Sequence, residues 1–329
     1  MRPSTITTCS IPIWKALESY GCDSQTLFEQ VGLDTEKLHD PNARYPFASL
    51  QRLWKLATVT TRDPCFGLTV ARFLHPTTLH ALGYAWMASE SLYDALERLT
   101  RYSKMITDAA EFRLGEASNS YRLVVCWRHQ RGTDQAMDAA MGAILGMCRM
   151  SYGAELNPLR LTLQREPPPS LQRFEEVFRA PVQFSAAENA LYLGKREVDT
   201  PLPTANAELA RANERVITKY LAQFERGSVK LQVEAKLLER LPSGHTSQES
   251  IAKALHLSSR SLQRKLKEEG TTYKQLLEDT RRELAAQYVK ESELSVGEIT
   301  FLLGFSEPAN FSRAFKRWTG VSPSAYRFL

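Results

Sequence analysis

No stretch of the sequence is apolar for long enough to span a membrane. A transmembrane helix needs roughly 18 consecutive apolar residues. The longest candidate in the 329-residue chain, at 139–148, is expected to form a buried helix instead. Residues 1–11 also lack a basic segment followed by an apolar one, so we expect no secretory signal. These absences favour a protein of the cytoplasm with no membrane partner.

Cysteine is scarce and scattered. The five cysteines are an odd number, and no C-x-x-C pair occurs among them. Their spacing favours reduced thiols over a disulfide framework or a zinc site. His75 and His80 lie close together in the sequence but have no third ligand nearby, so we expect no bound metal.

The motifs of several enzyme classes are absent as well. The sequence has no Gly-rich phosphate-binding loop, no G-x-S-x-G nucleophile turn and no H-E-x-x-H zinc motif. We therefore expect no catalytic residue, no cofactor and no enzymatic activity.

Charge is nearly balanced, with a net value of +5, but it is unevenly placed. Residues 228–329 carry 16 Lys and Arg against 12 Asp and Glu, whereas residues 1–227 carry 26 against 25. A basic terminal third suggests a polyanion as the partner. The hydrophobic fraction of 43% and the charged fraction of 24% are ordinary for a globular protein, which excludes a wholly disordered chain.

The pattern of the sequence changes near residue 227. Before that point, helical spacing over 46–61, 91–106 and 208–224 accompanies strand-like alternation. The segments expected to be strands are 111–114, 121–127, 159–163, 182–184 and 190–193. Beyond it the strand signals stop. We therefore predict a multidomain protein, with an α+β domain over 1–227 and an all-α domain over 228–329. The helix over 208–224 has three open interpretations: core, rigid linker or dimer seam.

The all-α part contains a pseudo-repeat. Each copy begins with an S/T-x-x-E capping pattern, at 246–249 and at 295–298, and continues as a short apolar helix. A tight turn and a second helix follow, the second helices being expected at 259–269 and 307–319. Helix, short turn and second helix form the helix-turn-helix pattern.

The second helix of each copy has an apolar face and a polar face. In the first copy Leu262 and Leu266 face inward. The opposite face of that helix carries Arg260, Gln263, Arg264 and Lys267. The second copy has an inner aromatic stripe of Phe311, Phe315 and Trp318. Its outward side chains are Asn310, Arg313 and Arg317. Arg suits guanine in the major groove, and Gln or Asn suits adenine. On a lone helix such charges are usually only solvated, but two capped copies with acid-free basic faces favour DNA binding.

Residues 272–291 link the two copies and have helical period without an interior Gly or Pro. Such a helix spans roughly 30 Å, close to the roughly 34 Å of one turn of DNA. A rigid connector of that length can hold the two second helices in successive major grooves.

The last hundred residues resemble the AraC/XylS transcription regulators. The matching segments are SLQRKLK at 261–267, GF at 304–305, FSRAFK at 311–316 and PSAYR at 323–327. The resemblance implies a seven-helix, double helix-turn-helix (AraC-type) DNA-binding domain. By position, it implies base-facing sites at Arg260, Gln263 and Arg264, and at Pro308, Ala309, Asn310, Ser312 and Arg313. Lys267 and Lys316 complete the expected DNA contacts. Because Pro308 and Ala309 hydrogen-bond poorly, we expect mainly phosphate contacts plus Arg313 from the second helix, or apolar contact with thymine methyl groups.

Residues 15–200 resemble the arabinose-binding-like regulatory domain found in one branch of that family. The match rests on DPCFGL at 63–68, LGY at 82–84, ALERL at 95–99 and RY at 101–102. The resemblance implies a domain that senses a small molecule or mediates dimerisation, and the label does not make arabinose the ligand.

Six aromatic side chains of this domain are candidates for lining a ligand pocket, although a core position is favoured for each. They are Tyr84, Trp86, Tyr102, Trp127, Tyr152 and Phe174. Arg101 and Arg128 have the chemistry to meet a ligand carboxylate, but a surface position is favoured for both.

These patterns predict a sequence-specific transcription regulator, by resemblance an activator, whose partners are double-stranded DNA and RNA polymerase. A small-molecule effector and homodimerisation through the first domain are expected to control it by a population shift. The alternative is a repressor, or a ligand-independent regulator whose first domain only dimerises. A cysteine-dependent repair enzyme would need a metal-held cysteine cluster, which the sequence lacks. A nonspecific architectural binder would need neither readers such as Gln263 nor a large mixed domain.

Overall fold

The computed structural model describes residues 3–117, 119–128, 130–224, 229–291 and 294–327. The chain forms two compact units, Met1–Glu214 and Arg215–Leu329. The division falls inside helix α10 (Ala207–Phe224). The boundary expected between residues 227 and 228 lies outside the described residues.

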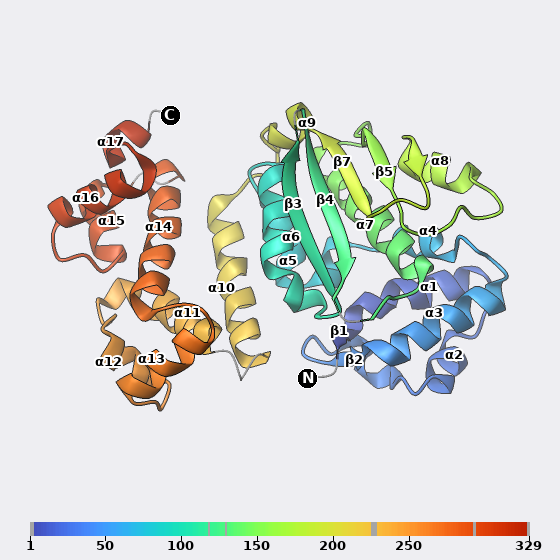
Figure 1. Ribbon diagram of the computed structural model, residues 1–329, viewed down its shortest axis with the longest axis horizontal. Coiled ribbons are helices and arrows are strands. Elements are labelled where there is room, and N and C mark those ends of the chain that lie inside the picture. The colour runs from blue at the N-terminus through green and yellow to red at the C-terminus, as the bar shows by residue number, and fades with distance from the viewer. Residues whose placement is uncertain (1–2, 118, 129, 225–228, 292–293, 328–329) are drawn as a thin grey trace. The chain divides into compact units, whose positions relative to one another are not determined.

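A five-stranded sheet organises the first unit (Figure 1). Its strands, in spatial order, are β3 (Ala110–Ala117), β4 (Ser120–Trp127), β7 (Ala190–Gly194), β5 (Arg160–Thr162) and β6 (Val182–Gln183). Neighbouring strands run antiparallel except β5 and β6, which are parallel. The expected hairpin is confirmed, since β3 pairs with β4 along its whole length. Two further strands, β1 (Ser4–Ile6) and β2 (Arg44–Pro46), pair with each other apart from the sheet.

Helices surround this sheet and form a second layer, in which α5, α6 and α7 lie behind the strands (Figure 1). The α-helices of this unit before α10 are α1 (Ile11–Ser19), α2 (Ser24–Gln30), α3 (Phe47–Thr61), α4 (Phe66–Ala71), α5 (Ala81–Met87), α6 (Leu92–Ile106), α7 (Asp134–Tyr152), α8 (Gln172–Phe178) and α9 (Lys195–Asp199). Three 3-10 turns join them: η1 (Thr7–Ser10), η2 (Thr35–His39) and η3 (Pro76–Leu79). The helices expected over 46–61, 91–106 and 208–224 are confirmed as α3, α6 and α10. All five cysteines are free thiols.

The second unit is helical throughout its described residues. After α10 it contains α11 (Val229–Arg240), the 3-10 turn η4 (Leu241–Ser243), α12 (Gln248–Ala254), α13 (Ser259–Glu268), α14 (Tyr273–Glu291), α15 (Val296–Leu302), α16 (Pro308–Thr319) and α17 (Pro323–Tyr326). These are the seven α-helices that the family resemblance implies. Within the described residues of both units, no helix is long and apolar enough to cross a membrane.

Two separate cores stabilise the second unit, one for each copy of the repeat. The first core gathers Val229, Val233, Leu237, Ile251, Ala252, Leu262, Leu266, Tyr273 and Leu276. The second gathers Ala285, Val289, Ile299, Leu303, Phe311 and Phe315. Helix α14 contributes its first turns to one core and its last turns to the other. The expected connecting helix is therefore confirmed, and it is anchored at both ends.

Candidate nucleic-acid interface

Helices α12 and α13 form the first helix-turn-helix. Helix α13 begins after Ser258, whose Oγ accepts a hydrogen bond from the Ser261 amide at 3.1 Å. Leu262 and Leu266 are both 0% exposed and pack into the first core. Because these two leucines fix the rotation of α13 about its axis, the opposite face of the helix points to solvent.

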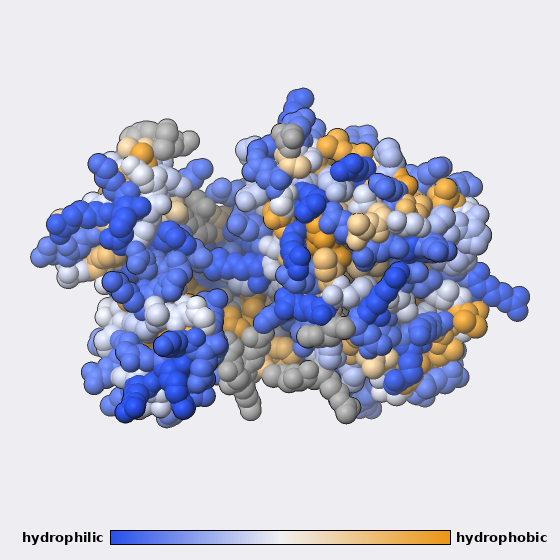
Figure 2. Space-filling view, in the orientation of Figure 1, coloured by the Kyte–Doolittle hydropathy of each residue, from blue (hydrophilic) through white to orange (hydrophobic). Residues whose placement is uncertain are grey.

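That outer face of α13 carries the side chains expected to read DNA. All four are exposed: Arg260, Gln263, Arg264 and Lys267. Arg264 makes only a weak contact, with its Nε 3.9 Å from Glu268 Oε1 between two well-exposed side chains. Gln263 Nε2 lies 3.4 Å from Gln248 Oε1, which is also a weak hydrogen bond. Figure 2 shows a hydrophilic surface over α12 and α13. The polar groups of α13 are thus available to an external partner.

The start of α12 differs from the expected one. Its cap is Ser247, whose Oγ accepts a hydrogen bond from the Ser250 amide at 3.1 Å, so the capping pattern expected over 246–249 is wrong by one residue. Thr246 is held outside the helix, because its carbonyl accepts a 2.6 Å hydrogen bond from the buried Tyr273 hydroxyl.

Helices α15 and α16 form the second helix-turn-helix. The capping box expected here is confirmed: Ser295 Oγ accepts from the Glu298 amide at 3.2 Å, and Glu298 Oε2 accepts from the Ser295 amide at 2.8 Å. The turn passes through Gly304 at φ 65°, a left-handed conformation that glycine adopts without strain. Phe311 and Phe315 are 0% exposed and fix the rotation of α16.

The outer face of α16 is poorer in free polar groups than that of α13. Ala309, Arg313 and Lys316 are exposed, whereas Asn310 and Ser312 are half-buried. Arg313 Nη2 donates to Asn310 Oδ1 at 2.7 Å, so these two candidate readers are bonded to each other. Direct base reading by α16 therefore requires that this pair open or act as one unit.

The side chain of Arg317, expected to face outward, is exposed but engaged. Its Nη2 lies 2.5 Å from Glu278 Oε1, on α14, and Trp318 Nε1 donates to the same oxygen at 3.0 Å. These donors, Trp318 foremost, hold the pKa of Glu278 below its usual value. The contact ties α16 to the connecting helix, a role that no sequence pattern indicated for Glu278.

Arg281 of α14 donates hydrogen bonds to the turn of the second helix-turn-helix. Its Nε donates to the Leu303 carbonyl at 2.9 Å and its Nη2 to the Gly304 carbonyl at 2.7 Å. Its guanidinium carbon also lies 4.4 Å from the centre of the Phe305 ring. Burial lowers the pKa of Arg281. The sequence does not indicate this role, because Arg281 is there one of several basic residues on an amphipathic helix.

The connecting helix sets the distance between the two reading helices. Helix α14 has 19 residues, which at 1.5 Å per residue span about 28 Å. That length is close to the roughly 34 Å of a DNA turn. Each end of α14 is held by its own core, so one continuous helix joins the two helix-turn-helix copies.

In the first unit, the segments that carry the family resemblance hold elements together. Asp63 accepts hydrogen bonds from the Tyr20 hydroxyl, from Arg173 of α8 and, at 2.8 Å, from the Cys65 amide. Gly83 of α5 packs so closely on η3 that a Cβ there would overlap the Pro76 carbonyl.

Like Asp63 and Gly83, Arg98 of α6 lies in a segment that carries the family resemblance and holds elements of the fold together. Its side chain is buried, with 9% of the residue exposed. It pairs with Asp94, donates to Ser89 Oγ at 3.1 Å and lies 2.7 Å from Glu214 Oε1 of α10. The resemblance in this unit therefore rests on packing and on ion pairs that support the fold.

Of the six aromatic pocket candidates, Trp127 lines a cavity of about 190 Å³ in the first unit, and the other five do not line that cavity. Trp86 is 0% exposed and donates from Nε1 to Ser151 Oγ at 3.1 Å, and Phe174 packs against Phe178 and Phe184. Tyr102 is buried, Tyr152 is half-buried and Tyr84 is half-exposed. Arg101 and Arg128 are exposed. Among the described residues no cluster of His, Cys, Asp and Glu could hold a metal ion.

Two capped helix-turn-helix copies on a rigid connector, with exposed Arg and Gln side chains, define a DNA-binding protein. Two family models match the chain. The arabinose-binding domain of AraC transcription regulator (N-terminal) matches residues 21–202, and a helix-turn-helix domain matches residues 251–328. The chain belongs to the AraC family of transcription regulators.

Relatives in that family match over most of the chain. The ornithine utilization regulator of Pseudomonas aeruginosa is 30% identical over 310 residues, covering 94% of this chain and 91% of the relative. The regulator VirS of Mycobacterium tuberculosis is 26% identical over 298 residues, covering 88% and 86%. The crystal structure of the regulator CdpR from Pseudomonas aeruginosa shares the fold, with a TM-score of 0.52 at 22% identity over 97% of this chain and 98% of that one. Like these relatives, the chain is a DNA-binding transcription regulator.

Proposed function

We propose that this regulator reads its operator mainly through α13, with α16 placed one DNA turn away. The observation that carries this proposal is the outer face of α13. Buried Leu262 and Leu266 orient that helix, and Arg260, Gln263 and Arg264 project from it with little internal bonding. Their guanidinium and amide groups match the acceptors of guanine and the paired donor and acceptor of adenine.

Helix α16 makes the less specific contacts in this proposal. Ala309 offers a methyl group, which suits the thymine methyl in the major groove. Arg313, bonded to Asn310, and the exposed Lys316 supply positive charge for the DNA backbone. In this proposal the sequence preference comes mainly from the half-site that α13 contacts. Both half-sites, the one at α13 and the one at α16, contribute to the affinity.

The experiment compares Arg264→Ala with Lys267→Ala on an operator obtained by in vitro selection. Arg264→Ala should weaken binding to that operator by about 1–3 kcal/mol and relax the preference at one base position. Lys267→Ala, as a phosphate contact, should weaken binding equally on all sequences and lower the salt dependence by about one unit. Equal loss for Arg264→Ala on selected and random DNA would refute its reading role.

In this proposal the first unit regulates DNA binding: an effector that binds this unit shifts the population of DNA-binding conformations. Helix α10 supports such a route, because it is one continuous helix across the division between the units and its first half is held by the ion pair of Glu214 with buried Arg98. We propose activation through RNA polymerase, a homodimer, a cytoplasmic location and no catalytic activity. Sedimentation tests the homodimer, and in vitro transcription tests activation through RNA polymerase. Unchanged transcription with every effector tried, together with a stable dimer, would assign the unit to dimerisation alone.

A further inference from the structure

A pair of glutamine side chains joins the two helices of the first helix-turn-helix. Gln248 is the first residue of α12 and is half-buried, whereas Gln263 lies on the outer face of α13 and is exposed. Gln248 Nε2 donates to the Ser259 carbonyl at 3.4 Å, and Gln248 Oε1 accepts from Gln263 Nε2, also at 3.4 Å. The hydrogen bonds therefore run from the backbone of α13, through Gln248, to a side chain that is proposed to read DNA.

The backbone carbonyl decides how both amides are turned. A side-chain amide can rotate by 180° and exchange its oxygen and its nitrogen, but a backbone carbonyl only accepts hydrogen bonds. Because Gln248 donates to the Ser259 carbonyl, its nitrogen points there and its oxygen faces Gln263. Gln263 then turns its own nitrogen toward Gln248, since the opposite orientation would bring two oxygens together.

Both helices that carry the pair are anchored. Helix α12 begins after the Ser247 cap, and the Thr246 carbonyl before it accepts a 2.6 Å hydrogen bond from the buried Tyr273 hydroxyl. Helix α13 begins after the Ser258 cap, and Leu262 packs into the first core. The two glutamines thus project from backbone that the fold holds in place.

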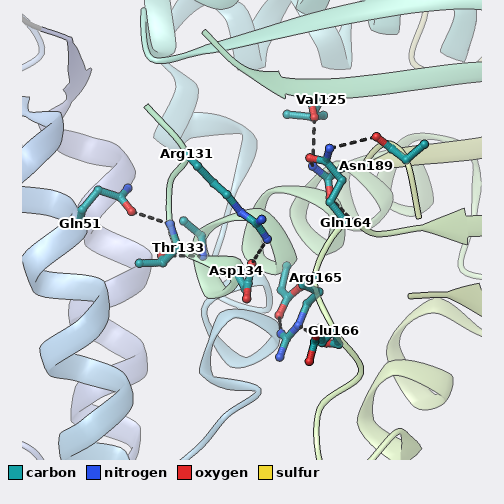
Figure 3. A network of polar contacts seen from close by, with 12 residues as sticks. Gln51, Val125, Arg131, Thr133, Asp134, Gln164, Arg165, Glu166 and Asn189 are labelled. Carbon is teal, nitrogen blue, oxygen red and sulfur yellow. Dashed lines mark hydrogen bonds and ion pairs between the residues drawn. The ribbon is translucent and has the colours of Figure 1, made fainter. Parts of the chain in front are cut away.

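An amide pair in the first unit is closed, because its oxygens and nitrogens all bond inside the protein. Asn189 Nδ2 donates to the Val125 carbonyl at 3.4 Å and to Gln164 Oε1 at 2.9 Å (Figure 3). Gln164 Nε2 donates to the Ala187 carbonyl at 3.0 Å, and Asn189 Oδ1 accepts from the Gln164 amide at 2.9 Å. The pair in the second unit is open by comparison: among the described residues, nothing but Gln248 bonds the side chain of Gln263.

The remaining groups of Gln263 match the edge of one base. An amide nitrogen has two N–H donors, so Gln263 keeps one donor beside its unbonded oxygen. Adenine presents an acceptor, N7, beside a donor, N6, in the major groove. A reversed amide would place its oxygen against N7. An amide that is already turned correctly therefore binds adenine with less loss of side-chain freedom.

We propose that Gln248 is a positioning residue for base reading, which holds the Gln263 amide in the orientation that donates to N7 and accepts from N6 of adenine. Gln248 itself contacts no base in this arrangement. At 3.4 Å both hydrogen bonds of Gln248 are weak in solvent, but they strengthen where DNA excludes water. The inference rests on the proposed reading role of α13 and adds a residue of α12 to it.

The second copy of the repeat has no such pair. Val296 and Ser312 lie at the corresponding positions, three residues before Ile299 and directly after Phe311. Valine has no group that could orient a neighbouring polar side chain by a hydrogen bond. This difference agrees with a sequence preference that comes mainly from α13.

The experiment measures the binding of the full chain to an operator obtained by in vitro selection and to that operator with each base changed. Gln263→Ala identifies the position that Gln263 reads, where the preference for adenine should fall about 10- to 100-fold. Gln248→Met keeps a side chain of similar length and removes the amide. It should lower the same preference about fivefold, the effect of one hydrogen bond. Binding to random DNA should not change, because no charge is lost.

The double variant separates positioning from direct contact. If Gln248 acts through Gln263, Gln248→Met should have no further effect on base preference once residue 263 is alanine. Losses that add would show that Gln248 contacts DNA itself, and this would overturn the inference. A lower Tm with equal loss on all sequences would also overturn it, because Gln248 would then only support the fold. As a matched control, Gln275→Met makes the same chemical change at an exposed position of α14 and should leave the preference unchanged.

The single variants distinguish failure of this inference from failure of the proposed function. If Gln263→Ala relaxes the adenine preference and Gln248→Met does not, the reading proposal stands and the positioning inference fails. If Gln263→Ala relaxes a preference for another base, the inferred orientation of the amide is wrong. If Gln263→Ala changes no base preference, the reading role of Gln263 and the positioning role of Gln248 both fail.

Discussion

The contact of Arg281 with the second helix-turn-helix leads to a quantitative prediction. Arg281→Met keeps an apolar stem of similar length and removes the donors to the Leu303 and Gly304 carbonyls. Hydrogen bonds from a charged group contribute about 1.5–3 kcal/mol each, and the contact with the Phe305 ring adds about 0.5–2 kcal/mol. Relief of the desolvated guanidinium, whose pKa burial lowers, offsets part of the loss. We expect a net destabilisation of about 2–4 kcal/mol.

Amide hydrogen exchange is the appropriate assay, because a chain with two units does not unfold in one step. The loss should fall on α15 and α16, whose side chains share the second core. At 1.4 kcal/mol for each factor of ten, their most protected amides should exchange about 30- to 700-fold faster. Amides of α12 and α13 should change little, since those helices pack in the first core.

The neighbouring residue provides the control. Arg282 is exposed and pairs with Asp279 on the same helix at 3.0 Å, a kind of surface pair that contributes less than about 1 kcal/mol. Arg282→Met should therefore leave exchange in α15 and α16 almost unchanged. Equal exchange rates in the Arg281→Met and Arg282→Met variants would refute the view that Arg281 supports the turn.

Three further predictions concern stability. Gly83→Ala should destabilise the first unit by about 3 kcal/mol or more, measured as a fall in its Tm, because the added Cβ would overlap the Pro76 carbonyl. Ser295→Ala should cost about 1 kcal/mol, seen as faster exchange at the start of α15, and a cost of zero would exclude a contribution from the capping box. Burial raises the pKa of Asp138 from 3.8 to about 7 despite its pairing with Arg165. Between these values the folded state keeps a proton that the unfolded state has lost, so the unfolding free energy should fall as the pH rises from about 4 to 7. Asp138→Asn should flatten that slope.

The sequence predicted those features that depend on periodic burial. Leu262 and Leu266 were expected to face inward from their spacing alone, and both are fully buried. The hairpin β3–β4 was likewise predicted from alternation, because side chains on one face of a strand share one environment. These patterns are local, so a single sequence contains them.

Features that depend on contacts between residues far apart in the chain could not be predicted from the sequence. The cap of α12 is one case: Thr246 and Ser247 are both hydroxyl residues, and the choice between them is made by Tyr273, which bonds the Thr246 carbonyl from α14. Arg281 is another, since its partners lie more than twenty positions further along the chain. The cavity of the first unit is a third case, because residues from several separate elements line it, among them Phe47 of α3, Phe112 of β3 and Ala140 of α7.

The family resemblance and the cavity involve almost separate sets of residues in the first unit. Of the segments at 63–68, 82–84, 95–99 and 101–102 that carry the resemblance, only Leu99 lines the cavity. Asp63, Gly83 and Arg98 instead hold elements of the fold together. Two proteins can therefore share these segments, and the fold that they support, while binding unrelated effectors. Neither the arabinose of the domain's description nor the ornithine of a relative's name transfers to this chain.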